Sequence, residues 1–162
     1  MSKFMKLLSW AIALFITAIF VDSLRFKFTG HPTPEHIFTT LRDWSGIGLF
    51  YPAGPWVIGL AELASSLLVL VIPLIFTWMK APRNAARSQF LGALIAFGVM
   101  SGAIVFHLFT PLGIATPTEW NEAGTEILAE GNLLFYMACL VWVGSIILMT
   151  TRAKQMKGGT RF

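Results

Sequence analysis

Residues 88–109 read SQFLGALIAFGVMSGAIVFHLF, a run that contains no Lys, Arg, Asp or Glu. A helix needs about 20 mainly apolar residues to cross the hydrocarbon core of a bilayer, so this run is long enough. Because water is absent there, the backbone must form its hydrogen bonds within the segment, which favours a helix. Strands of a membrane barrel would instead alternate apolar and polar residues over about 10 positions. The run therefore predicts a transmembrane helix.

Three similar runs predict further spans at about 7–28, 54–79 and 132–151. The composition agrees, because the 162 residues are 56% hydrophobic and only 12% charged, whereas a soluble domain is about 25% charged. The first run resembles a signal peptide, but no clear Ala-x-Ala site follows it, so we expect it to be retained. We therefore expect an all-α membrane protein in which residues 1–162 form a single domain, a four-transmembrane-helix bundle.

The charges predict how these spans are oriented. Nine of the twelve basic residues fall on one side of the membrane: Lys3, Lys6, Lys80, Arg83, Arg87, Arg152, Lys154, Lys157 and Arg161. Basic residues mark the cytoplasmic side, so both termini are expected in the cytoplasm. We expect the protein to be a multi-pass protein of a bacterial inner membrane. The basic residues form no polar stripe, so the net charge of +4 does not indicate a nucleic-acid partner.

The two loops on the opposite side are long and carry helix-start signals. In the first loop, Thr33 precedes Pro34 and Glu35, and residues 37–44 repeat apolar side chains at helical spacing. In the second loop, residues 116–119 read TPTE, which matches a capping box. We therefore expect short amphipathic helices in the two outer loops, where they would lie on the outer membrane face and offer a docking surface.

Polar side chains are expected to gather between the helices in the outer half of the membrane. The candidate buried polar cluster consists of Asp22, Arg25, Lys27, Glu62, Ser66, His107 and Glu130. A charge inside a span is costly, so each such residue needs a partner or a function. One interpretation is a site for a quinone headgroup, another small polar ligand or a proton path. The other is internal packing, with Glu62 paired to Arg25 or Lys27.

Other motifs indicate no chemistry of their own. The spacing of His31, His36 and His107 matches no metal motif, so we expect no metal site, and a haem held by two histidines has no support. Phosphate loops, Cys-x-x-Cys pairs and serine nucleophile motifs are absent from the sequence, and no catalytic residue is assigned. Gly98 and Gly102 form a Gly-x-x-x-Gly pair, which predicts close helix packing within the bundle.

Several segments together resemble DoxX-like membrane proteins. They are residues 26–32 (FKFTGHP) with Glu35, 59–63 (GLAEL), 91–94 (LGAL), 101–108 (SGAIVFHL), 112–114 (LGI) and 130–135 (EGNLLF). The resemblance covers about residues 24–149, and it implies a four-helix membrane bundle. It also implies a link to membrane redox systems, since that family includes a quinone-reducing thiosulfate oxidoreductase. Lys27, Glu62, His107 and Glu130 match the family pattern, whereas the long segment 115–129 departs from it.

Three functions compete at this point. The first is an accessory subunit of a membrane-bound, redox complex, without independent catalytic activity, which contacts other subunits through its outer loops. The second is a quinone-binding or redox-active membrane protein in its own right; no other cofactor is evident. The third is a small transporter, although four spans are few for one protomer and no inverted repeat is visible. We favour the first, because long outer loops provide docking surface, and the role of loop 110–131 stays open.

Overall fold

The computed structural model describes residues 3–157, and within them four helices are long and apolar enough to cross a membrane. The elements in chain order are α1 (Lys3–Phe28), α2 (Pro32–Ser45), the 3-10 turn η1 (Gly48–Phe50), α3 (Ala53–Ser66), the π-helical turn η2 (Leu67–Val71), α4 (Ile72–Trp78), α5 (Pro82–Phe109), β1 (Thr116–Trp120), β2 (Ile127–Gly131) and α6 (Leu133–Lys157). The predicted helical membrane protein with four spans is therefore confirmed. Arg161, one of the nine basic residues above, lies outside the described residues.

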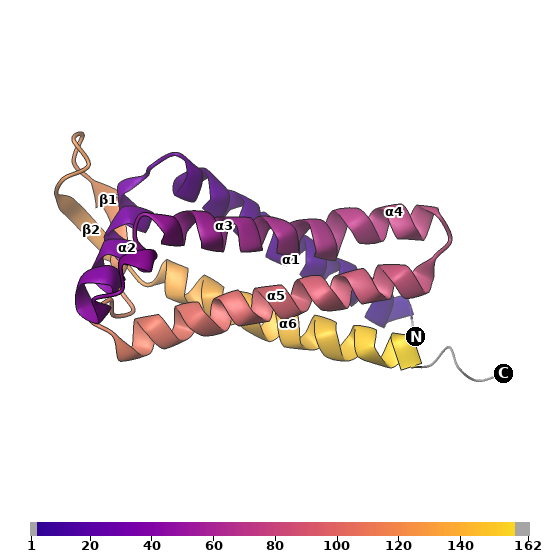
Figure 1. Ribbon diagram of the computed structural model, residues 1–162. Coiled ribbons are helices and arrows are strands. Elements are labelled where there is room, and N and C mark those ends of the chain that lie inside the picture. Colours follow the sequence, from indigo (N-terminus) through magenta and orange to yellow (C-terminus); the bar gives the residue numbers. More distant parts are fainter. Residues whose placement is uncertain (1–2, 158–162) are drawn as a thin grey trace.

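The spans form a ring of four neighbours (Figure 1). Helix α1 packs against α3 and α6, and α5 packs against α3, α4 and α6. The start of α1, the α4–α5 turn and the end of α6 lie at one end of the bundle, called here the inner end (Figure 1). At the opposite end, α2, η1, β1 and β2 form a layer, called here the outer layer. The charge asymmetry read from the sequence thus corresponds to the two ends of one bundle.

The core is narrow and rich in small side chains. Its fully buried residues include Ile16 and Phe20 on α1, Val69 on η2, and Ala93 and Ala96 on α5. Alanines on α5 let α6 approach closely along the length of both helices. Large apolar side chains instead cover the outside of the spans, with Leu14, Leu60, Leu94 and Leu140 all exposed. Such a surface fits a lipid environment, and the fold is that of a multi-pass helical membrane protein.

The second span contains a π-helical turn that the sequence analysis did not predict. In η2 the N–H of Ile72 bonds to Leu67 O instead of Leu68 O, and Pro73 has no N–H to offer to Val69 O. Neither Leu68 O nor Val69 O therefore receives the usual bond from the residue four positions later. Helix α5 supplies both donors, since Ser88 Oγ lies 2.8 Å from Leu68 O and Gln89 Nε2 lies 2.9 Å from Val69 O. This cross-helix pairing satisfies buried backbone groups that no water can reach.

The two outer loops fold differently. The first contains α2, which begins at Pro32, after His31 as its N-cap, and not after Thr33. The second forms an antiparallel hairpin of β1 and β2, so the helix predicted from the capping-box motif is wrong. Tertiary contacts decide this, because Trp120 and Pro117 bond to Thr33 of α2. The turn closes on Asn121, whose Oδ1 accepts the N–H of Thr125.

Candidate functional site

In the half of the bundle next to the outer layer, the most deeply buried charged side chains are those of Lys27 and Glu62. Lys27 Nζ, near the end of α1, lies 2.9 Å from both Oε1 and Oε2 of Glu62, in the middle of α3. The side chains are only 12% and 2% exposed. Lys27 also donates to Ser23 Oγ, one turn earlier on α1. An ammonium group has three N–H donors, and all three are used here.

Close helix packing places this pair. A Cβ atom at Gly59 would lie 2.6 Å from the ring of Phe28, so only glycine lets α1 and α3 approach at this level. Glu62 follows three residues later on the same face of α3. Ser66, one turn further, donates to the backbone oxygen of Glu62 at 2.8 Å and does not bond to its carboxylate. Ser66 thus supports the helix that carries the acid.

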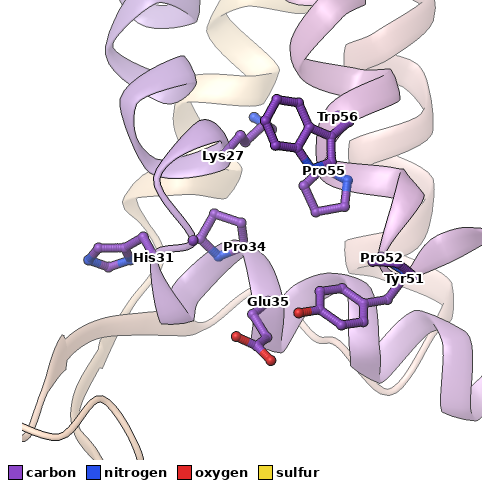
Figure 2. A pocket seen from close by; sticks show the side chains of 9 residues that line it. Lys27, His31, Pro34, Glu35, Tyr51, Pro52, Pro55 and Trp56 are labelled. Atoms are coloured by element: carbon purple, nitrogen blue, oxygen red, sulfur yellow. The ribbon is translucent and has the colours of Figure 1, made fainter.

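A hollow of about 120 Å³ opens above the pair, between the end of α1 and the starts of α2 and α3. Figure 2 shows the side chains around it. Its lining residues are Lys27, Gly30, His31, Pro34, Glu35, Tyr51, Pro52, Pro55 and Trp56. They come from the end of α1, the start of α3, the first turn of α2 and the segments that connect these helices, so the hollow lies at the boundary between the bundle and the outer layer.

Glu35 and Tyr51 form the most polar side of the hollow. The Tyr51 hydroxyl points toward the Glu35 carboxylate (Figure 2). This hydrogen bond, together with desolvation and the negative charge of Glu35, raises the pKa of Tyr51. Arg42 lies over the Tyr51 ring, with its guanidinium carbon 5.8 Å from the ring centroid. Arg42 is itself paired with Asp43 at 2.7 Å, and no ion pair among residues 3–157 includes Glu35.

His31 lies at another edge of the hollow. Its Nδ1 accepts the backbone N–H of Thr33 at 3.2 Å, so a neutral His31 carries its proton on Nε2. Partial burial and then the positive charge of Arg25 lower the pKa of His31. The ring is therefore neutral at pH 7. A neutral His31 caps α2 and keeps Nε2–H as a donor.

The structure does not bring the other predicted residues into this site. Asp22 and Arg25 form their own pair, with 2.8 Å between Arg25 Nε and Asp22 Oδ1, and their side chains are 61% and 67% exposed. Arg25 also lies over the ring of Phe26, 4.4 Å from its centroid. This pair stands on the outside of α1, because residues 22 and 25 share a face that residue 27 does not.

His107 and Glu130 have separate positions. His107 is buried and its Nδ1 donates to Gly113 O at 2.6 Å, which fixes the chain just after α5. Its ring meets the edge of Phe135 on α6. Glu130 lies on β2 opposite Pro117 and is exposed. The expected cluster therefore divides, and Lys27, Glu62 and Ser66 are the members that stay close together.

Gly98 and Gly102 do not provide the close helix packing expected of them. A Cβ atom at either position would meet nothing within 4 Å. Close contacts occur at other glycines, namely Gly54 against Phe38, Gly59 against Phe28 and Gly92 against η2. The sequence motif marked a helix face that no other part of residues 3–157 covers closely.

The sequence analysis did not predict four residues of the site. Ser23 bonds to Lys27, and Glu35, Tyr51 and Trp56 line the hollow. Ser23 could have been found from its spacing of four residues before Lys27 on one helix. Tyr51 and Trp56 are aromatic residues of the kind that is common at membrane interfaces, so their type alone did not indicate a site. Within residues 3–157, no group of three or more His, Cys, Asp or Glu side chains could hold a metal ion.

The fold and this site define the class: a multi-pass helical membrane protein with an ion pair buried between its spans and a small hollow at its outer boundary. Comparison with known proteins adds no relative, because no family model, no curated protein and no solved structure matches the chain. The DoxX-like resemblance therefore stays a prediction from the residues quoted above.

Proposed function

We propose that this chain is an accessory subunit of a larger membrane-bound complex and that it contacts its partner through the outer layer. The DoxX-like resemblance adds that the complex is a redox complex. In this proposal the chain catalyses no reaction by itself. The complex would lie in a bacterial inner membrane, with both termini of this chain in the cytoplasm and α2 at the outer membrane surface, since basic residues concentrate at the inner end.

The observation that carries this proposal is the hydrogen-bonded link between the two outer loops. Thr33 Oγ1 accepts from Trp120 Nε1 at 2.8 Å and donates to Pro117 O at 3.2 Å. Thr33 is buried, and the ring of His36 meets the edge of the Trp120 ring. Segments more than 80 residues apart thus form one surface. A surface that is already ordered loses less entropy when a partner binds, which favours docking.

Apolar side chains on this surface could serve as anchors. The exposed ones are Trp44, Ile47, Leu49 and Leu128. Phe38 packs against α3 at Gly54, so the layer that carries these side chains is fixed to the bundle. Interfaces are commonly held by a few large apolar or aromatic residues surrounded by polar ones.

Native gel electrophoresis of gently solubilised membranes tests this proposal. The tagged chain at its natural expression level should migrate in a complex larger than any oligomer of itself. Leu128→Ser should reduce that complex, whereas Met79→Ser, an equally exposed residue at the inner end, should leave it intact. A wild-type chain that always migrates alone, even after crosslinking in the membrane, would refute the proposal.

A second candidate function is binding of a quinone headgroup in the hollow. It is favoured by the Trp56 ring, which stacks on Phe28 with 5.0 Å between ring centroids and offers a flat apolar face at the hollow. His31 Nε2–H would donate to one carbonyl oxygen. Lipid extraction and an absorbance spectrum of the purified protein test this, and a preparation without quinone would exclude it.

A further inference from the structure

The positively charged groups around the hollow are already paired, whereas one negatively charged group is not. Lys27 is neutralised by Glu62, and its three donors are already used. His31 is neutral, and Arg42 is paired with Asp43. Glu35 is exposed at the mouth and receives a hydrogen bond from Tyr51. A carboxylate has about four acceptor positions, so Glu35 keeps lone pairs for a ligand. No ion pair in the described part of the chain compensates its negative charge.

The walls around this carboxylate are aromatic and apolar. Tyr51 and Trp56 contribute rings, and Pro34, Pro52 and Pro55 contribute apolar surface without N–H donors. Stacking on Phe28 fixes the orientation of the Trp56 ring. Figure 2 shows the Tyr51 ring beside the Glu35 carboxylate and Trp56 at the far end of the hollow, beside Lys27 and Pro55. A carboxylate beside an aromatic ring is a surrounding that suits an organic ammonium group. The volume of about 120 Å³ admits a group of that size.

The opposite edge of the hollow offers donors. In Figure 2, His31 lies on the other side of Pro34 from Glu35 and Tyr51. Its Nε2–H is free of the capping bond that Nδ1 makes. Arg25, whose Nε is paired with Asp22 on the outside of α1, adds positive charge near this edge. Such donors suit a phosphate.

We propose that the hollow binds the zwitterionic headgroup of a phospholipid, with the ammonium group at Glu35 and Tyr51 and the phosphate at the edge of the hollow beside His31. The site lies where α1 ends and α3 begins, which is the level of the lipid headgroups for spans of this length. An anionic headgroup without an amine would place no cation against Glu35. A quinone would need donors for both carbonyl oxygens, whereas Lys27 has none left.

Native mass spectrometry of the delipidated full-length chain tests this inference. Phosphatidylethanolamine, phosphatidylglycerol and soluble phosphoethanolamine are added separately. Phosphatidylethanolamine should bind best, and Glu35→Gln should weaken it about tenfold, because a charge-assisted hydrogen bond is lost. Glu122→Gln, which removes an exposed acid from the hairpin turn, is the matched control and should bind as the wild type does.

A second variant keeps the inference testable if Glu35→Gln folds poorly. Tyr51→Leu removes the aromatic ring beside Glu35 and should also weaken binding of phosphatidylethanolamine, with the fold checked by circular dichroism. Equal binding of phosphatidylglycerol, unchanged binding by both variants, or equally tight binding of soluble phosphoethanolamine would each overturn the inference. It does not depend on the proposed subunit role, which the native gel tests separately.

Discussion

Lys27 Nζ lies 2.9 Å from both carboxylate oxygens of Glu62, and this ion pair joins the outer end of α1 to the middle of α3 across 35 residues of sequence. Replacing one of the two residues leaves the other charge buried and without its partner. We expect Lys27→Met or Glu62→Leu alone to destabilise the protein by about 3–5 kcal/mol. The double variant should recover most of that loss, because two apolar side chains need no charge partner. Unfolding in detergent measures all three.

Asp22→Asn provides the comparison for this prediction. Asp22 and Arg25 are an ion pair on the same helix, but both side chains are mostly exposed. Screening makes exposed pairs weak, so this variant should unfold almost as the wild type does. A double Lys27 and Glu62 variant that is as unstable as the worse single variant would contradict the buried-pair account.

Gln89 on α5 is expected to stabilise the π-helical turn. Gln89→Leu removes the donor to Val69 O, which Pro73 cannot replace, and should cost about 1–3 kcal/mol. Adding Pro73→Ala should restore part of the loss, because an alanine at this position brings an N–H that can bond to Val69 O. Thermal unfolding of the single and double variants measures this. The same melting temperature for both would show that the carbonyl does not need this donor.

Gly92 is expected to be the glycine that the packing requires. An added Cβ would lie 2.7 Å from Val69 Cγ1 and 2.9 Å from Val69 N, so backbone would have to move. Gly92→Ala should therefore destabilise the protein by about 1–3 kcal/mol. Gly98→Ala is the control, since its Cβ meets nothing within 4 Å and alanine favours a helix. Equal melting temperatures for the two variants would count against the observed packing of α5 on η2.

His31 should make stability depend on pH. Burial and Arg25 lower its pKa in the folded protein, so the unfolded chain binds a proton more readily. Its contribution is complete above about pH 6.5, the ordinary pKa, and is lost as the pH falls through the folded pKa. The melting temperature should therefore drop between pH 7.5 and 5.5. His31→Asn keeps a good N-cap without a titrating ring and should remove this part of the drop.

Hydropathy alone predicted the four spans, because lipid forces each apolar run to form its own helix. Thr33, Pro34 and Glu35 indicated the first outer helix, although its cap proved to be His31. The second loop could not be predicted in the same way. A TPTE segment suits a capping box or a strand, and the choice depends on Trp120 reaching Thr33, which is 87 residues away.

The candidate site could be predicted only in part. Lys27 and Glu62 stood out because charges in spans need partners, but the sequence could not choose between Arg25 and Lys27 for Glu62. The choice depends on helix rotation, which turns Arg25 outward and Lys27 inward. Gly98 and Gly102 misled for the same reason, since periodicity does not show which helix face meets a neighbour. The hollow arises from three segments that only the fold brings together.

Cysteine labelling in intact cells tests the central claim, a four-span bundle with its outer layer outside the cytoplasm. Cys139, the chain's one cysteine, is first replaced by alanine. A cysteine at Ala123, in the hairpin turn, and another at Asn84, at the start of α5, are then exposed to a membrane-impermeant maleimide. We predict labelling at position 123 and none at position 84 until the cells are lysed. Labelling at 84 but not at 123, or at both in intact cells, would contradict the account.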